Sequence, residues 1–486
     1  MPKILMIDID TLRPDHMGCY GYSRNTTPNL DSVASDSMIF ENYFCSDAPC
    51  LPSRAALVFG QFGIKTGIVG HGGTAADKPL TGAGRSFTDS EERQNLFYLF
   101  RKAKMHTASI SSFPERHSAW WFNAGFNETY NVGGSGMESG EEVIPIVNDW
   151  LDRNKNKDDW FLHVHLWDPH TPYRAPESFG NPFKDSPLHY NWITEDVFAK
   201  HLKKSGPHSA QDLAGASNYF NPKYPRYPGS LENLKDIKEF IDNYDCGIRY
   251  ADELLGQVIQ RLKDYDIYND TAIIVTSDHG ENMGELGLYG EHATADQITC
   301  KIPMIIKWPG GAKGRDSEFR YNLDLLPTMA DLLQKPIHKK WDGKSYAEVF
   351  NGNNSKGWEG LVLSQQAHVC QRSVRFGDYL YMRTIKDGFH LFDDEMLFNI
   401  KDDPHEQYNI VADNPDICAK GAKIILDWLE NAMKTSEQDT DPMWTVYNEG
   451  GPFHAPDDFL VHYLKRLENS GRSEAAMRLR EKYKLE

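Results

Sequence analysis

The sequence predicts an α/β domain built on a mostly parallel sheet, followed by a smaller α+β domain near the C-terminus. Three apolar stretches are continuous rather than alternating, as in parallel strands that are buried on both faces. They span residues 3–9, 160–167 and 271–276, and residues 303–308 form a weaker fourth stretch. Segments of helical period separate them, which is the alternation expected of a sheet flanked by helices.

Two segments illustrate the helical pattern. Thr27 and Pro28 place a capping residue and a proline at the start of a helix that continues through Val33. Apolar residues recur at three- and four-residue spacing over residues 248–262, giving one apolar stripe of an amphipathic helix. Residues 181–230 have no sustained period, so we expect a long irregular insertion there.

The character of the sequence changes after about residue 365. Residues 374–384 alternate as antiparallel strands do, and residues 424–433 resemble a helix packed over them. We therefore assign residues 1–365, with the insertion, to the main α/β domain. Residues 366–486 form the α+β domain and a C-terminal extension.

Composition excludes several classes of protein. The 486 residues include 52 basic and 70 acidic side chains, and the net charge of −18 argues against a nucleic-acid partner. No apolar run approaches the ~20 residues of a membrane helix, and seven scattered cysteines predict no disulfide framework. The start of the sequence does not resemble a secretory signal, so we expect a cytoplasmic protein, or a periplasmic or secreted one if a signal has been removed.

The segment Cys-Leu-Pro-Ser-Arg at residues 50–54 carries the most chemical information. A helix-like run follows Cys50, which places its side chain at a helix N-terminus, where an anion or an anionic nucleophile is stabilised. Arg54 adds planar donors suited to a tetrahedral oxyanion. Two other interpretations are a structural cysteine in a turn and a thiolate nucleophile of cysteine-protease or phosphatase type.

Cys-x-Pro-Ser-Arg resembles the signature of the type I sulfatases, in which a maturation enzyme oxidises the cysteine to formylglycine. Further segments resemble that family in the expected order: residues 7–16, 26–31, 168–173, 276–281 and 403–406. The resemblance spans most of the chain. It implies an alkaline-phosphatase-like fold in which residues 1–365 are the catalytic domain, and it implies hydrolysis of a sulfate ester.

Acidic residues follow two of the predicted strands. Asp10 ends the first strand, and Asp278 and His279 end a later one, where ligands bind in open α/β sheets. Together with Cys50, the resemblance implies that they hold one divalent cation. Oxygen ligands with one histidine suit Ca²⁺ best, with Mg²⁺ or Mn²⁺ as alternatives to it.

The sequence departs from the family at one metal ligand. Most such sulfatases carry two adjacent aspartates, whereas Thr11 follows Asp10 here. Asp8 lies two residues earlier, on the same face of the strand, so it either replaces the missing carboxylate or the site has one ligand fewer. Relatives that hydrolyse phosphonate monoesters or phosphodiesters also lack the second aspartate.

The resemblance implies a mechanism. Cys50, as formylglycine, is hydrated to a diol that attacks sulfur, and Asp278 helps to deprotonate it. Arg54 and the metal neutralise charge on the sulfuryl oxygens. His170 matches the histidine that protonates the leaving group.

Two lysines of the family are missing. Where relatives carry a lysine and a histidine after the strand that follows the nucleophile helix, this sequence has Arg116 and His117, so we expect Arg116 to contact the anion and His117 to assist release of sulfate. His292 stands eleven residues before Pro303, at the place of the second lysine. A histidine there predicts activity that favours slightly acidic pH.

Weaker candidates surround these residues. Trp167 offers a platform for a sugar ring, although aromatic residues more often belong to the core. His71 stands in a glycine-rich segment and lines the pocket, unless that segment is only a turn. A C-terminal loop with Trp444, Glu449 and His454 is assigned mostly to packing.

The function we expect is hydrolysis of a sulfate ester on a saccharide of glycosaminoglycan type, attacked at its end. The partners are that saccharide and the maturation enzyme, without nucleic acid or membrane. Two alternatives remain: a phosphonate monoester hydrolase or phosphodiesterase on the same scaffold, and a non-catalytic anion binder in which Cys50 is never converted.

Overall fold

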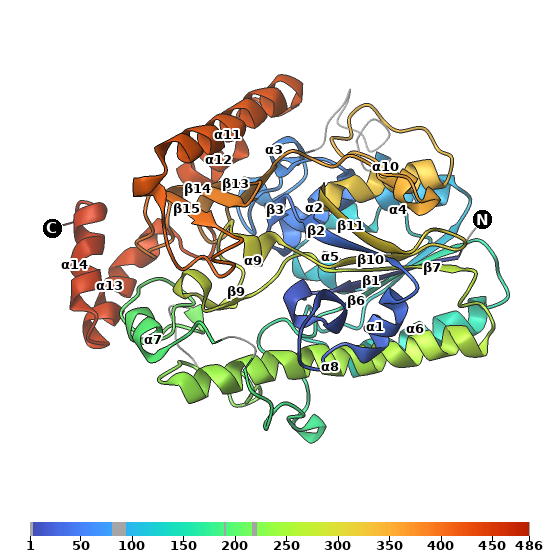
Figure 1. Cartoon of the computed structure of the whole chain (residues 1–486), viewed down its shortest axis with the longest axis horizontal. Helices are drawn as coiled ribbons and strands as arrows, with labels where there is room; N and C mark the ends of the chain where they lie inside the picture. Colours follow the sequence, from blue (N-terminus) through green and yellow to red (C-terminus); the bar gives the residue numbers. More distant parts are fainter. Residues whose placement is uncertain (1–2, 80–93, 189–190, 216–220, 486) are drawn as a thin grey trace.

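An eight-stranded sheet forms the centre of the chain in the order β11-β2-β10-β7-β1-β6-β4-β5 (Figure 1). A computed structural model describes residues 3–79, 94–188, 191–215 and 221–485. The strands of this sheet are β1 (Lys3–Ile9), β2 (Met38–Phe44), β4 (His106–Ile110), β5 (Glu128–Tyr130), β6 (Trp160–Leu166), β7 (Thr271–Thr276), β10 (Met304–Lys307) and β11 (Gly314–Tyr321).

The three continuous apolar stretches are strands, as predicted. β1 and β7 have the predicted bounds, and β6 ends one residue early. Five neighbouring strands run parallel, in the order β7, β1, β6, β4 and β5. Their carboxyl ends therefore meet at one edge of the sheet. The mostly parallel α/β architecture is therefore confirmed.

The fourth stretch is a strand, but the expectation that it runs parallel was wrong. β10 is antiparallel to both β7 and β2. A parallel partner would need a crossover along the sheet, whereas the chain after β7 stays at its carboxyl end. It forms β8 (Asn282–Met283), β9 (Tyr289–Glu291) and α9 (Gln297–Cys300) there. The Gly280 amide then donates to the Thr299 carbonyl at 2.7 Å, which holds this segment against the end of β7.

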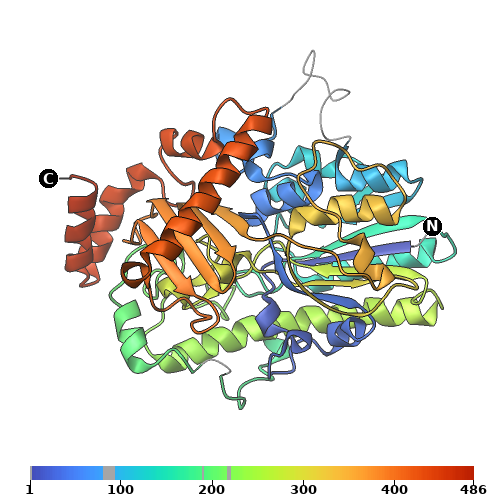
Figure 2. The same cartoon turned by 45° about the horizontal axis from the view of Figure 1, so that its top comes forward.

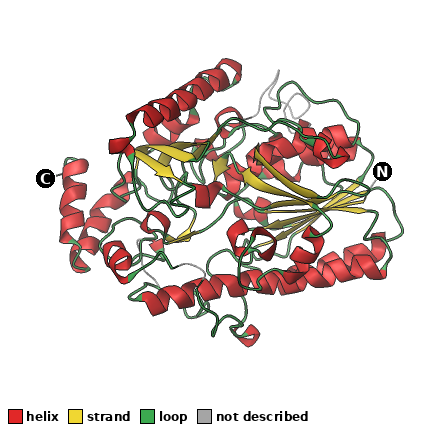
Figure 3. Ribbon diagram, viewed as in Figure 1, coloured by secondary structure: helices red, strands yellow, loops and turns green. Residues whose placement is uncertain are grey.

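Helices cover both faces of the large sheet (Figures 1 and 3). Successive side chains of β1 enter two different cores, because neighbouring residues of a strand point to opposite faces. On one face lie α1 (Pro28–Ala34), α6 (Gly140–Asn154) and α8 (Leu234–Asp264). On the other lie α2 (Cys50–Phe59), α3 (Gly63–Thr66), α4 (Leu96–Lys102) and α10 (Leu325–Leu332).

The predicted helices exist, with two differences. α1 begins at Pro28, but Thr27 does not cap it with its side chain, since the hydroxyl donates to Asp31 at 3.0 Å. α8 begins well before the predicted apolar stripe, because the Asn233 side chain accepts hydrogen bonds from two amides of its first turn. The insertion at residues 181–230 contains one helix, α7 (Glu195–His201), within its described part.

A second, five-stranded sheet has the order β15-β14-β13-β12-β3. Its strands are β3 (Asp47–Ala48), β12 (Leu361–Gln365), β13 (Cys370–Phe376), β14 (Tyr379–Lys386) and β15 (Glu395–Asn399). The alternation at residues 374–384 spans the antiparallel hairpin of β13 and β14. Figure 2 shows α11 (Pro415–Thr435), which includes the predicted helix, lying across this sheet.

The two sheets are joined beside the nucleophile helix. β3 ends two residues before Cys50 and pairs in parallel with β12, so the first half of the chain supplies an edge strand to the smaller sheet. The predicted division at residue 365 falls between β12 and β13 and stays a prediction. The chain ends with α12 (Pro442–Asn448), α13 (Leu460–Asn469) and α14 (Ser473–Lys482). Among the described helices, we find none with the length and apolar character needed to cross a membrane.

A buried ion pair ties three distant segments together. Arg13, after β1, lies 3.1 Å from Glu285, and both side chains are fully buried. His405, in the turn after β15, lies 3.0 Å from the same carboxylate. Burial would raise the pKa of Glu285, but the charge of Arg13 and the contact with His405 outweigh it and lower the pKa to about 2.

This ion pair predicts acid-sensitive stability. Because the folded-state pKa lies below the ordinary value, ionised Glu285 stabilises the fold fully above about pH 4.5 and loses this contribution as the pH falls toward 2. Glu285→Gln should therefore lower the free energy of unfolding at pH 7 by about 3 kcal/mol. Urea unfolding from pH 7 downward should show the difference from the unsubstituted protein narrowing below pH 4.5.

A matched control is Glu468→Gln, which removes an exposed partner of Arg480. It should change stability by less than about 1 kcal/mol at any pH. A difference for Glu285→Gln that stays constant with pH would contradict the prediction.

Candidate active site

Four residues meet at the carboxyl edge of the large sheet. Asp10 follows β1, Asp278 and His279 follow β7, and Cys50 is the first residue of α2. One ligand atom of each lies within 4.8 Å of those of the others, and all four side chains are buried. The Cys50 sulfur is 3.0 Å from His279 Nε2. The parallel strands thus bring together the residues that the sequence assigned to the metal.

This donor set fits a divalent cation. Oδ1 of Asp10 is buried and has no hydrogen-bond partner among the described residues. His279 Nδ1 lies 2.9 Å from the Gly280 carbonyl, and a proton on Nδ1 leaves Nε2 free to bind a cation on the side of Cys50 and Asp278. Two carboxylates and one imidazole are ligands that Ca²⁺, Mg²⁺ and Mn²⁺ accept.

Cys50 is a poor thiolate in this setting. Burial, with Asp10 and Asp278 nearby, raises the pKa of its thiol well above the ordinary value. A cysteine nucleophile normally has a lowered pKa and an electropositive surrounding. The surroundings of Cys50 therefore disfavour the thiolate mechanism of a cysteine protease or phosphatase.

Arg54 holds the acidic residues of the site. It stands four residues after Cys50 on α2, so both side chains lie on one face of the helix and point to the strand ends. Its guanidinium donates to Asp8 at 2.8 Å, to Asp10 at 3.0 Å and to Asp278 at 2.6 Å. Burial would raise the pKa of Asp8 and of Asp10, but Arg54 and nearby histidines lower both. The contact that the sequence predicts between Arg54 and the sulfuryl oxygens stays a prediction.

Asp8 and Thr11 flank the four-residue group. The Asp8 carboxylate contacts Arg54 and lies 3.6 Å from His163 Nε2, and it is not a member of the group. Thr11 has a positive φ of 57°, and its amide donates to Asp278 at 3.2 Å. The Thr11 hydroxyl is buried without a partner among the described residues. Replacement of the missing carboxylate by Asp8 stays a prediction.

Two further histidines lie against this group. His170 Nδ1 is 2.6 Å from the Thr171 carbonyl, so this nitrogen carries the proton when the ring is neutral, and Nε2 lies 4.0 Å from Asp10. The ring of His292 lies 3.8 Å from that of His279 and 5.5 Å from that of His170. Both sequence-predicted residues are thus adjacent to the reacting position.

The pKa of His292 is set by one neighbour. Its Nε2 lies 2.7 Å from a Glu291 carboxylate oxygen. Burial lowers the pKa of His292, but the charge of Glu291 outweighs burial and raises it. The sequence expectation of a histidine that carries charge is consistent with this direction.

The outer candidates surround Cys50 less closely. His71 Nε2 is 3.5 Å from the Leu51 amide, and its ring lies 4.9 Å from that of His117, which follows α5 (Phe113–Arg116). Arg116 lies over the ring of Trp167 at 5.0 Å from its centroid. Trp167 is buried, so Arg116 covers one face of the predicted platform. The role of Trp167 in sugar binding stays a prediction.

Sequence reasoning missed a group of residues behind His292. Glu291 lies within 3.2 Å of His208 and 3.7 Å of His368, in addition to its contact with His292. His454 stacks on His368 at 4.1 Å and contacts His71 at 3.0 Å. The C-terminal loop assigned mostly to packing therefore reaches the candidate site. Only the adjacency of Glu291 to His292 was visible in the sequence.

The family model described as Sulfatase matches residues 2–335. The chain belongs to the sulfatase family. A second model, N-sulphoglucosamine sulphohydrolase, C-terminal, matches residues 284–429. The resemblance found in the sequence motifs is therefore confirmed, and this sulfatase is a sulfuric ester hydrolase.

Individual relatives agree with this assignment. The choline-sulfatase of Rhizobium meliloti (strain 1021) is 27% identical over 461 residues, covering 85% of this chain and 83% of the relative. A solved structure in complex with D-glucosamine-2-N,6-O-disulfate has a TM-score of 0.71 at 17% identity, covering 91% of this chain and 99% of that one. The phosphonate monoester hydrolase of Agrobacterium radiobacter has a TM-score of 0.69 at 20% identity, covering 89% of this chain and 96% of that one. Both structures share the fold of this sulfatase.

The contacts of Arg54 generate a testable prediction. Arg54→Ala should lower the free energy of unfolding by about 3–5 kcal/mol, because three buried carboxylates lose their shared positive charge. Denaturant unfolding measures this effect. A chelator is added so that no bound cation replaces part of the lost positive charge. Arg153→Ala is the control, because Arg153 is 48% exposed and pairs only at the surface. Similar losses in the two variants would refute the central role of Arg54.

Proposed function

We propose that this sulfatase removes sulfate from the end of a sulfated saccharide of glycosaminoglycan type, through a formylglycine derived from Cys50. The grouping of Asp10, Cys50, Asp278 and His279 within 4.8 Å carries this proposal. It combines a convertible cysteine with the donors of a divalent cation at one buried point.

Asp10, Asp278 and His279 would hold the cation together with the modified side chain at position 50, and Ca²⁺ suits them best. When bound, a divalent cation supplies Lewis-acid stabilisation of negative charge on the sulfuryl group. Asp8 stays a candidate for a further ligand.

Formylglycine requires a maturation enzyme as a partner of the nascent chain. The hydrated aldehyde supplies one hydroxyl as the nucleophile and a second through which sulfate is released as the aldehyde forms again. The Asp278 carboxylate is positioned by Arg54 and accepts a proton from the attacking hydroxyl. Arg116 and His117 assist at the anion and during release.

His170 acts as the general acid in this proposal. With its Nδ1 proton on the Thr171 carbonyl, Nε2 is the nitrogen that delivers a proton to the departing alcohol oxygen. His292 and its neighbour Glu291 lie beside this position, where a protonated imidazole donates to a sulfate oxygen. His71 and Trp167 remain candidates for saccharide contacts.

Two observations support a saccharide attacked at its end. Cys50 is only 2% exposed, so a residue in the middle of a polymer would have to bring its flanking units into the protein with it. The second family model also names an enzyme of sulfated glucosamine. A terminal sulfated sugar meets both requirements.

A phosphonate monoester hydrolase is the second candidate. The observation that favours it is the absence of a second carboxylate beside Asp10, where Thr11 stands instead. The fold is shared with enzymes of that activity. Initial rates on 4-nitrophenyl sulfate, 4-nitrophenyl phenylphosphonate and a set of defined sulfated mono- and disaccharides decide between them. Turnover of terminal saccharide sulfates with a higher kcat/KM than the phosphonate supports the proposal, and a preference for the phosphonate refutes it.

Conversion of Cys50 predicts loss of turnover in Cys50→Ala with the thermal unfolding temperature preserved, because alanine cannot become an aldehyde. Cys418→Ala removes another buried cysteine, far along the chain, and should keep full activity. Mass spectrometry of the Cys50 peptide from an active preparation should show a mass below that of the cysteine form. An unmodified mass in such a preparation, or an active alanine variant, would refute the mechanism, and an inactive unmodified protein would favour the anion binder.

The role of His170 predicts a dependence on the leaving group. His170→Ala should reduce kcat/KM for a sugar sulfate by about 10²–10⁴-fold, and much less for 4-nitrophenyl sulfate, whose alcohol needs little protonation. His462→Ala, an exposed histidine of α13, is the control and should change neither rate. Equal losses on both substrates would refute the acid role.

A further inference from the structure

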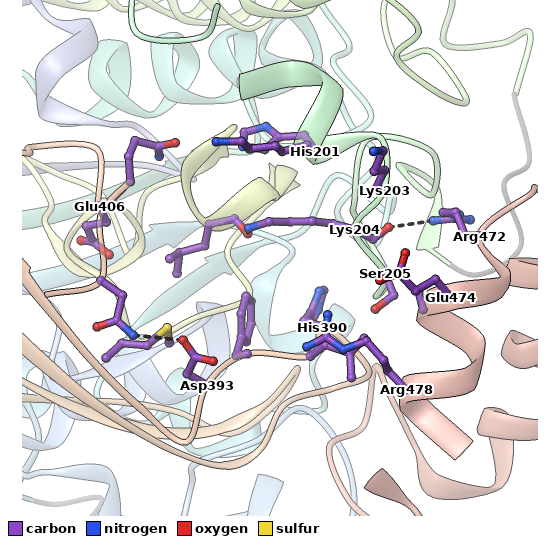
Figure 4. A pocket seen from close by; sticks show the side chains of 18 of the residues that line it. His201, Lys203, Lys204, Ser205, His390, Asp393, Glu406, Arg472, Glu474 and Arg478 are labelled. Carbon is purple, nitrogen blue, oxygen red and sulfur yellow. Dashed lines mark hydrogen bonds between the residues drawn. The ribbon is translucent and has the colours of Figure 1, made fainter. Parts of the chain in front are cut away.

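A second pocket, of about 530 Å³, lies apart from the four-residue group. Three segments and Leu286 line it (Figure 4): the segments are the one that ends α7, those around β15, and the C-terminal helix α14. The first contributes residues 200–205, the second residues 390–409 and the third residues 471–478. The mechanism proposed above uses none of them.

Cations without a carboxylate partner among the described residues dominate this pocket. Its basic residues are Lys200, Lys203, Lys204, Arg472 and Arg478. Arg472 pairs at 2.6 Å with Asp212, a carboxylate that Arg466 also contacts. For the other four, the described part of the chain provides no carboxylate within 4.0 Å. Four positive charges therefore share one pocket on a chain of net charge −18.

The acidic residues of the pocket offset only part of this charge. Asp393 and Glu474 are exposed carboxylates. Glu406 is buried, and burial together with the charge of Asp296 raises its pKa well above the ordinary value, which favours its uncharged form. Its Oε2 has no hydrogen-bond partner among the described residues, and a protonated carboxyl can donate from such an atom.

Lys204 is the most desolvated of the cations. Its ammonium donates to the Leu286 carbonyl at 2.6 Å and has no second acceptor in the described ranges. Burial lowers the pKa of Lys204 to about 8, with Asp393 acting against this shift. An ammonium with two unused donors, facing a pocket, is stabilised when an anion enters.

A short series of contacts connects this pocket to the active site. His390, in the pocket wall, packs against Gly206, whose φ of +103° and lack of a Cβ permit the approach. His208 follows two residues later and lies 3.2 Å from Glu291, which contacts His292 at 2.7 Å. The pocket wall and the proposed sulfate contact therefore belong to one packed network.

We propose that this pocket is an accessory binding site for a sulfate group. Several donors converge on it from different elements, which suits the oxygens of a tetrahedral anion. The identity of the occupant rests on the proposed function: it is either a second sulfate of the saccharide whose end occupies the active site, or sulfate released by the reaction.

The test uses charge reversal at exposed positions of the full-length protein. Lys203→Glu with Arg478→Glu reverses two charges in the pocket, and Lys465→Glu with Lys157→Glu reverses two exposed charges elsewhere. Isothermal titration with sodium sulfate at low ionic strength should show at least tenfold weaker binding to one class of sites in the pocket variant only. Equal affinities in the two double variants would overturn the site. This titration needs no turnover, so it stands even if the proposed saccharide activity fails.

A second arm identifies the source of the sulfate. For an occupant on the saccharide, the pocket variant should raise KM at least tenfold for a polysulfated tetrasaccharide and leave KM unchanged for its terminal monosaccharide. If the occupant is free sulfate, the pocket variant should keep an unchanged KM for both the tetrasaccharide and the monosaccharide. The sulfate titration should still show the lost site. An unchanged titration together with equal KM changes in the pocket and control variants would reject both versions.

Discussion

The active site depends on one guanidinium that binds three carboxylates. Arg54 contacts Asp8 in β1, Asp10 just after β1 and Asp278 just after β7, and all of these groups are almost fully buried. Buried carboxylates are costly without a countercharge, so these contacts fix the two strand ends relative to α2. Because Cys50 lies one helical turn before Arg54, the same contacts determine where its side chain lies.

The C-terminal half of the chain also contributes residues around the active site. Gln365, at the end of β12, donates to the His292 carbonyl at 2.7 Å, and His454 contacts His71. The pairing of β3 with β12 keeps the smaller sheet next to Cys50. Residues near both ends of the chain therefore shape one site, although the four-residue group itself comes from the first 279 residues.

The sequence allowed prediction of the residues that lie at strand ends, because the position of a strand follows from a continuous apolar run and parallel strands end together. Asp10, Asp278 and His279 stand at such strand ends, and the resemblance to the sulfatases implied their role. It did not allow prediction of Glu291 with His208 and His368, since their proximity depends on how the insertion and the smaller sheet pack. The direction of β10 was missed for the same reason: a loop that folds back at one edge leaves no periodic signal.

The distribution of charge in the candidate site favours a bound cation. Burial lowers the pKa of most surrounding histidines, including His71, His170 and His368, which are therefore neutral. Three buried carboxylates share the single guanidinium of Arg54, and the carboxylate of Glu291 raises the pKa of His292. A divalent cation held by Asp10 and Asp278, as proposed above, would reduce the negative charge that a sulfate ester meets there. In that proposal, one ion both neutralises the acidic residues and attracts the anionic substrate.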